Sequence, residues 1–266
     1  MLVVMVDIHC HLLPGLDDGA ETMEESVQMA EMALADGITH VVATPHSSDT
    51  FRFDLERNLE LCRDLRERLG GRLQLGTGCD FHLSYENIEA AEADPKRFTI
   101  NQKNYLLIEF ADFALPPTLD QALERLQQAG MRLIVTHPER NGLIRNAPER
   151  LRRWIESGCY VQITAQSLTG RFGPSAQRSA EKLLQSDWVH FVASDAHSTR
   201  SRPLQLRAAY DLVVKEHSQE TARALFHDNP MAAWNGEPLP RAPEMEAQAQ
   251  QPSGWRRFFP PRATGQ

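Results

Sequence analysis

Two histidines separated by one residue, His9 and His11, follow an apolar run over residues 2–6. The run reads as a buried strand, and alternate residues of a strand point to the same side. We therefore expect His9 and His11 to face one way, with Asp7 beside them. Two imidazoles and a carboxylate at the carboxyl end of a strand are typical of a metal site. An HxH pair also occurs without any metal, so the rest of the sequence has to decide.

Further imidazoles and carboxylates follow most of the other strand-like runs. The candidates are His46, Asp80, Glu109, His137, Asp195 and His197, and Asp18 in the loop after His11 completes the set. One histidine at a strand end is usually incidental, but such residues at nearly every strand end are hard to obtain by chance. They predict one common site.

The runs that carry these residues alternate with amphipathic helical segments. We expect strands at 2–6, 39–44, 72–78, 104–108, 131–136, 159–164 and 188–193, and helices at 22–36, 54–69, 85–93, 118–129, 147–157, 175–186, 204–217 and 218–226. Continuous apolar strands alternating with helices indicate an α/β protein with a parallel sheet, and this number of units favours a closed or nearly closed barrel. A doubly wound open sheet is the alternative, although no GxGxxG or GxxxxGK[ST] loop follows a strand.

The candidate ligands are more numerous than one ion requires. A zinc or manganese ion takes about four to six ligands, some of them water or bridging carboxylates. The set therefore indicates two or three ions, with manganese, iron or zinc all compatible with nitrogen and oxygen ligands. Such clusters favour phosphoester hydrolysis by a metal-activated hydroxide. Arg140 and Arg202 follow His137 and His197 closely, and we expect their guanidinium groups to bind the phosphate.

A phosphatase with a cysteine nucleophile is a rival hypothesis, because such enzymes carry an arginine six residues after the cysteine. Of the four cysteines only Cys62 has this spacing, with Arg68. Cys62 lies on the apolar stripe of an expected helix, which indicates a core position. Cys10 lies between His9 and His11 and is expected to point away from the metals.

Composition limits the remaining functions. The net charge of −8 disfavours nucleic acid as a partner. No apolar run is long enough to cross a bilayer, and widely spaced cysteines fit a reducing compartment, so we expect a cytoplasmic protein. We expect one domain over residues 1–236, followed by a proline-rich and disordered tail over 237–266 that ends in the aromatic and basic stretch 255–259.

The ordered set of motifs resembles a known superfamily. DIHCH with PGLDDG, then TPH, LIEF, THPER and ASDAH, is similar to the polymerase-and-histidinol-phosphatase (PHP) superfamily, and more closely to its bacterial protein tyrosine phosphatases of capsular and exopolysaccharide synthesis. The resemblance runs from about residue 6 to residue 230. It implies a distorted (β/α)7 barrel similar to a TIM barrel and a trinuclear, usually manganese-dependent centre at the carboxyl ends of the strands. It also implies hydrolysis of phosphotyrosine on the tail of a bacterial tyrosine kinase.

Carried over by motif, the resemblance implies phosphate binding by Arg140 and Arg202. It implies metal binding by eight of the nine candidates, namely His9, His11, Asp18, His46, Glu109, His137, Asp195 and His197. One position departs from the family pattern, because Asp80 stands where the family usually has a glutamate. This shorter side chain either bridges two metals through a closer backbone or leaves one metal position weak, with His82 nearby. Two alternatives therefore stay open: a small-molecule phosphomonoesterase, such as a histidinol phosphatase, and a catalytically weak metal-binding regulator of the kinase. The oligomeric state is open as well.

Overall fold

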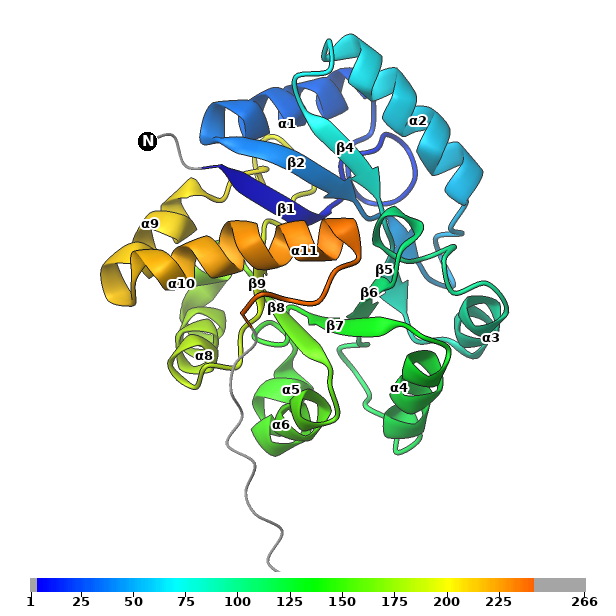
Figure 1. Ribbon diagram of the computed structural model, residues 1–266, viewed down its shortest axis with the longest axis vertical. Helices are drawn as coiled ribbons and strands as arrows, with labels where there is room; N and C mark the ends of the chain where they lie inside the picture. The colour runs from blue at the N-terminus through cyan, green and yellow to red at the C-terminus, as the bar shows by residue number, and fades with distance from the viewer. Residues whose placement is uncertain (1–3, 242–266) are drawn as a thin grey trace, which may run out of the picture.

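The computed structural model describes residues 4–241, and parallel strands form its centre with helices outside them (Figure 1). The strands are β1 (Met5–Cys10), β2 (Ile38–Ala43), β3 (His46–Ser47), β4 (Gln74–Thr77), β5 (Asp80–His82), β6 (Tyr105–Glu109), β7 (Arg132–Thr136), β8 (Tyr160–Thr164) and β9 (Phe191–Ala193). They pair in the orders β1-β2-β4 and β3-β5-β6-β7-β8-β9, and every pairing is parallel. The predicted α/β class is thereby confirmed.

Helices connect successive strands, as the alternating pattern predicts. They are α1 (Met23–Asp36), α2 (Leu55–Arg68), α3 (Tyr85–Ala93), α4 (Leu119–Gln128), α5 (Gly142–Arg145), α6 (Pro148–Glu156), α7 (Ala165–Leu168), α8 (Gly173–Gln185), α9 (Arg207–Glu216), α10 (Gln219–Arg223) and α11 (Asn229–Asn235). Thr22 caps α1, because its hydroxyl accepts a hydrogen bond from the Glu25 amide at 3.2 Å. Within residues 4–241, no helix combines the length and apolar character that a membrane crossing requires.

Two of the predicted strands are interrupted. Only Thr44 and Pro45 separate β2 from β3, and only Gly78 and Cys79 separate β4 from β5. Backbone hydrogen bonds continue across both breaks, from the Gly78 amide to the Ala43 carbonyl at 2.9 Å and from the Asp80 amide to the Pro45 carbonyl at 3.2 Å. Each pair of short strands therefore acts as one bent strand, and the two sheets form a continuous curved wall with seven strand positions, in agreement with the predicted units.

The wall returns to its starting point between β9 and β1. The Asp195 amide donates to the His9 carbonyl at 2.9 Å, and the His11 amide donates to the Ala196 carbonyl at 2.8 Å. Asp7 strengthens this junction, because its buried carboxylate accepts hydrogen bonds from the amide and the hydroxyl of Ser194. Asp7 thus serves the junction and does not join the histidines as the strand alternation predicts.

An apolar cluster in the interior includes Val6, Ile8, Leu107 and Ile134, all fully buried. Helix α11 contacts β1 and adds Ala233 and Trp234 to this cluster (Figure 1). Burial of apolar surface contributes about 25 cal/mol per Å², so this cluster stabilises the interior of the barrel.

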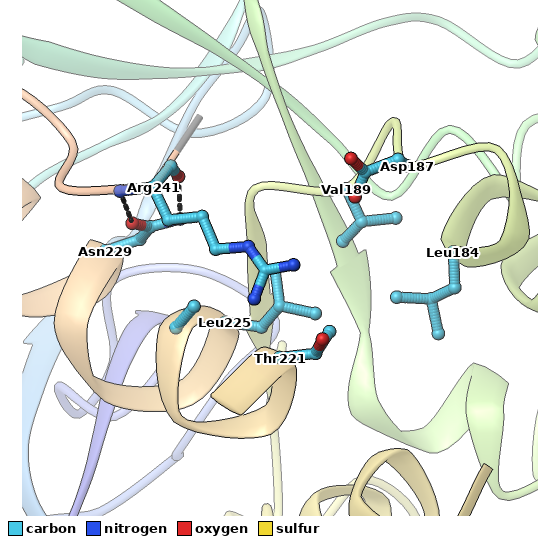
Figure 2. Close-up of a pocket in the computed structure, with 8 residues that line it drawn as sticks. Leu184, Asp187, Val189, Thr221, Leu225, Asn229 and Arg241 are labelled. Atoms are coloured by element: carbon cyan, nitrogen blue, oxygen red, sulfur yellow. Dashed lines mark hydrogen bonds between the residues drawn. The ribbon is translucent and has the colours of Figure 1, made fainter. Parts of the chain in front are cut away.

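The chain after α11 remains hydrogen-bonded to the barrel up to the last described residue. The Glu237 carbonyl accepts from the Tyr105 hydroxyl at 2.7 Å, and Asn229 binds both the amide and the carbonyl of Arg241 (Figure 2). Residues 237–241 of the predicted tail therefore lie against the barrel. The rest of that tail, with the stretch 255–259, lies outside the described residues.

Gly76 of β4 gives a test of this packing. A Cβ atom there would overlap the Asn101 amide oxygen and lie 2.9 Å from the Trp234 ring, so η1 (Ile100–Gln102) or α11 would have to move. We expect Gly76→Ala to lower the free energy of unfolding by about 1–3 kcal/mol, measured by urea denaturation.

Gly142→Ala is the matched control. A Cβ atom at Gly142 meets nothing closer than the Arg145 guanidinium at 3.7 Å. We expect a change below about 1 kcal/mol. Equal effects of the two substitutions would contradict the tight contact between β4, η1 and α11.

Candidate metal centre

His9 and His11 are both buried, and each ring is oriented by a hydrogen bond from its Nδ1 atom. His9 Nδ1 lies 2.8 Å from the Gln162 side-chain oxygen, and His11 Nδ1 lies 2.6 Å from an Asp17 carboxylate oxygen. Both partners are acceptors, so Nδ1 carries a proton and Nε2 is the nitrogen that faces the other ligands. This is the arrangement by which proteins prepare histidines as metal ligands.

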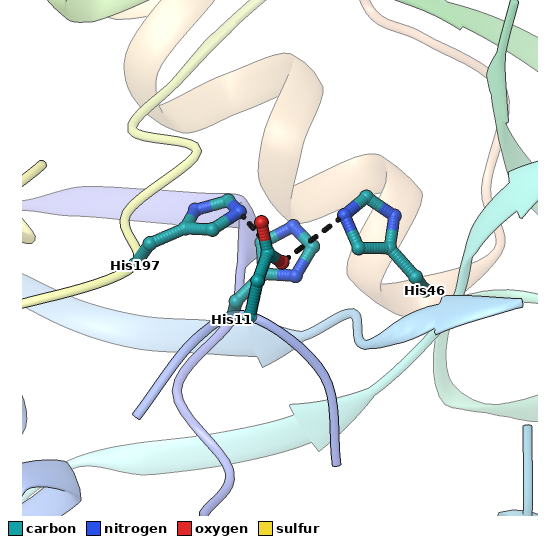
Figure 3. Close-up of side chains that lie close together, drawn as sticks. His11, His46 and His197 are labelled. Carbon is teal, nitrogen blue, oxygen red and sulfur yellow. Dashed lines mark ion pairs between the residues drawn. The ribbon is translucent and has the colours of Figure 1, made fainter. Parts of the chain in front are cut away.

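All nine predicted ligands converge at the carboxyl ends of the strands. Ligand atoms within 4.8 Å of one another form overlapping groups: His11, Asp18, His46 and His197; His9, His11 and Asp80; His9, His137 and Asp195; His46, His82 and Glu109; Asp80, Glu109 and His137. Figure 3 shows the imidazoles of His11, directly after β1, of His46 in β3 and of His197 in the loop after β9, pointing toward one another. The tertiary structure therefore brings together residues that lie far apart in the sequence.

The ligand atoms are spaced and left unpaired as a cation site requires. His9 Nε2 lies 3.4 Å from oxygens of both Asp80 and Asp195, and His46 Nδ1 lies 3.3 Å from Asp80. Ligands at metal distances of about 2.0–2.2 Å sit about 3.0–3.5 Å apart. In the described part of the chain, the Nε2 atoms of His9 and His11, His46 Nδ1 and both Asp80 oxygens are buried without a hydrogen-bond partner. Such atoms need a partner, and divalent cations fit this set.

Asp80 occupies a central place despite its short side chain. Its carboxylate belongs both to the group with His9 and His11 and to the group with Glu109 and His137. The break between β4 and β5 carries Asp80 forward, since its amide bonds to Pro45 across the interruption. This hydrogen bond fixes the backbone that presents the Asp80 carboxylate to both ligand groups.

Two residues of the centre require backbone conformations that side chains usually avoid. His137 and Asp195 have positive φ values of 35° and 51°. His137 directly follows β7, and Asp195 lies two residues after the end of β9. A backbone strained in this way costs about 1–3 kcal/mol, which the surrounding structure must offset. Strain of this kind accumulates at functional sites, which supports the assignment of this one.

The surroundings shift the pKa values of several ligands. Burial lowers the pKa of His137 to about 3, helped by the nearby Arg140 charge, so its imidazole is neutral and free to act as a ligand. Burial raises the pKa of Asp195, but His9, His11, Arg140 and Arg202 outweigh this effect and hold it well below its usual range. The neutral imidazole of His137 therefore lies next to the ionised carboxylate of Asp195.

Arg140 and Arg202 meet at one carboxylate. Both guanidinium groups contact the Oδ2 atom of Asp195, whose Oδ1 atom faces His9 and His11. Both also lie over the ring of Phe172, at 4.4 Å and 5.7 Å from its centroid. The predicted pair of arginines is therefore assembled beside the metal ligands, on a shared aromatic face.

The sequence pattern missed three contributors. Asp17 orients His11 and also accepts the His46 amide, Gln162 orients His9, and Phe172 supports the two arginines. Asp17 stands beside the chosen Asp18, so the DDG motif signalled it. Gln162 and Phe172 lie in no motif and carry no signal that sequence alone reveals. His82, noted only as a neighbour of Asp80, contacts Glu109 and joins one of the ligand groups.

A sequence model of the family described as capsular polysaccharide synthesis, CpsB/CapC, matches residues 5–235. The chain belongs to this family. Tyrosine-protein phosphatase YwqE of Bacillus subtilis is 33% identical over 259 residues, covering 96% of this chain and 99% of the relative. Tyrosine-protein phosphatase CpsB of Streptococcus pneumoniae is 28% identical over 235 residues, covering 85% and 96%. The predicted family is thereby confirmed.

Solved structures agree with the predicted barrel. A structure from a study of YwqE from Bacillus subtilis and CpsB from Streptococcus pneumoniae, described there as metal-dependent tyrosine phosphatases, superposes with a TM-score of 0.83 at 33% identity and covers 90% of this chain. A lactonase from Listeria monocytogenes, with a TM-score of 0.58 at 12% identity, shares the fold alone.

The cysteines of this family member give a further test. All four are buried, and burial raises the pKa of Cys62 and of Cys159 to about 12, and those of Cys10 and Cys79 well above their usual range. We expect iodoacetamide to label the native protein at pH 7.5 about 100-fold or more slowly than the denatured protein, followed by mass spectrometry. Rapid labelling of one native thiol would instead revive the cysteine nucleophile.

Proposed function

We propose that this chain is a metal-dependent protein-tyrosine phosphatase that acts in the cytoplasm on the phosphotyrosine tail of a bacterial tyrosine kinase in capsule or exopolysaccharide synthesis. The observation that carries the proposal is the overlap of five groups of nitrogen and oxygen ligands beside two arginines. The names of the relatives support the substrate class.

The proposed ligands are His9, His11, Asp18, His46, Asp80, Glu109, His137, Asp195 and His197, which fit two or three divalent ions. Manganese is the ion we favour, with iron or zinc compatible with the same donors. Bound ions supply Lewis acidity, which activates water for attack on phosphorus and neutralises phosphoryl charge.

The remaining tasks fall to this chain's own residues. Arg140 and Arg202 are proposed to bind the phosphoryl oxygens, because Asp195 engages one terminal nitrogen of each guanidinium group and the remaining N–H groups can donate to a phosphoryl group. His82 lies at the rim beside Glu109, and its side chain is 34% exposed, so it is our candidate for the proton donor to the leaving phenolate. The buried cysteines argue against a phosphocysteine intermediate.

The two alternatives differ in how well the geometry supports them. A catalytically weak regulator would require that the Asp80 carboxylate does not reach the metals. That carboxylate, however, belongs to two ligand groups. That position favours the enzyme. A small-molecule phosphomonoesterase would use the same centre, so only its substrates separate it from the tyrosine phosphatase.

Metal removal and replacement test the proposal. We expect chelator-treated protein to be inactive on a phosphotyrosyl peptide, and manganese to restore phosphate release by at least about 100-fold. Zinc, magnesium and buffer alone run in parallel, and histidinol phosphate runs beside the peptide. Released phosphate is the measurement.

A variant with Asp195→Ala and His197→Ala serves as the control and is expected to stay inactive with every ion. Preference for histidinol phosphate over the peptide would move the protein to the small-molecule branch. Inactivity of the metal-loaded wild type on both substrates would remove the enzyme proposal.

Phe172 tests the role of the arginine pair. Its ring supports both guanidinium groups, and each cation–π contact is worth about 0.5–2 kcal/mol. We expect Phe172→Leu to raise KM for the phosphotyrosyl peptide about 3–10-fold, with a similar loss of inhibition by inorganic phosphate, in steady-state assays.

Phe172→Tyr is the matched control because it keeps the aromatic face, and its KM is expected to stay within about twofold of wild type. Equal KM values for the leucine and tyrosine variants would show that the volume of the side chain, and not the cation–π contact, supports the arginines.

A further inference from the structure

A groove of about 580 Å³ opens beside the ligand cluster. His82 and Glu109 belong to both, so the groove and the candidate metal centre are continuous. Its other walls come from the loop after β3, the start of α3 and the loop between β6 and α4, at the carboxyl ends of β5 and β6 (Figure 1).

The walls of this groove are fixed by hydrogen bonds. The Asn87 side-chain amide donates to the carbonyls of Ser47 and His82, both at 2.9 Å. On the opposite wall the buried Asn141 amide donates to the Ala111 carbonyl at 3.2 Å, and Arg150 donates to the Pro116 carbonyl at 3.0 Å. A groove held in this way is formed before any ligand arrives, which lowers the entropy cost of binding.

The floor and rim differ in chemistry. Leu83, Phe110, Leu115 and Leu119 give the groove an apolar lining, and the Phe113 side chain at its edge is 89% exposed. A large aromatic side chain left in water next to an apolar groove is typical of a binding surface.

The charge of the groove is negative. Asp49 and Asp112 line it together with Glu109, and none of its described lining residues is a lysine or an arginine. Arg140 and Arg202 lie instead at Asp195. The phosphate of a substrate therefore belongs at the arginines, and the groove is left for an uncharged part of the same substrate.

We propose that this groove binds an apolar side chain next to the phosphotyrosine in the protein substrate and disfavours acidic residues at that position. The inference rests on the proposed function and deepens it by assigning a substrate subsite. A small phosphomonoester has no neighbouring side chain to place there, so the groove favours peptides over free phosphates.

The test compares Phe113→Ser with wild-type manganese-loaded protein on two substrates. For a phosphotyrosyl peptide with leucine on both sides of the phosphotyrosine, we expect kcat/KM to fall about tenfold, mainly through KM. For free phosphotyrosine we expect no change, because that substrate has no flanking side chain to contact Phe113. Tyr85→Ser is the matched control, since Tyr85 is another exposed aromatic residue (64%) that does not line the groove, and both substrates should be unaffected.

The charge of the groove gives a second arm. Replacing the flanking leucines by glutamates should raise KM for wild type about tenfold, and Asp49→Asn with Asp112→Asn should recover the part of that loss that comes from charge repulsion. No effect of Phe113→Ser on the peptide, or an equal effect on free phosphotyrosine, would overturn the subsite.

A binding measurement separates this proposal from the proposed function. The same leucine-flanked peptide carrying a non-hydrolysable phosphonate is titrated against wild type and Phe113→Ser. Weaker binding by the variant supports the groove even if wild type hydrolyses nothing, in which case the proposed function alone fails. Equal binding by both proteins, or none by either, overturns the groove.

Discussion

The structure depends on burying many polar ligand atoms in one place. Carboxylates and imidazoles from nearly every strand end lie within a few ångströms, several of them without a hydrogen-bond partner in the described chain. Burying such groups without opposite charge or hydrogen bonds costs several kcal/mol each, so the arrangement is unfavourable without cations. The residues around the ligand atoms orient them or share their charge. Asp17 and Gln162 fix imidazole tautomers, and the arginines share the charge of Asp195.

The irregularities of the barrel follow from the same requirement. The breaks at residues 44–45 and 78–79 come directly before His46 and Asp80, so both ligands lie where the chain departs from one regular strand. Gly78 suits its break, because a Cβ atom there would lie 3.1 Å from Val42 and 3.2 Å from Thr44. The junction between β9 and β1 is also irregular, and Asp7 and Ser194 hold it together. The distortion therefore belongs to the site and is stabilised by its own hydrogen bonds.

The surroundings divide the centre into two sides. On one side, Asp195 and Phe172 gather the arginines and make a positive site for a phosphoryl group. On the other side, Glu109 and His82 lead into an apolar groove with acidic residues at its rim. A phosphorylated aromatic residue within a peptide has a matching division, because its anionic group and its neighbouring side chains point in different directions. A small phosphomonoester would occupy the phosphoryl site and leave the groove empty.

The sequence by itself determined the α/β class, the strand and helix order and the nine candidate ligands, because strand periodicity and the position of polar residues at strand ends are local properties. It also excluded Cys62 as a nucleophile through its place on an apolar helical stripe. Only the tertiary structure decided that Asp7 serves the β1 junction, that Asp80 belongs to two ligand groups, and that Gln162 and Phe172 support the site. These facts depend on contacts between residues far apart in the chain and on backbone bends, and neither leaves a periodic signal in the sequence.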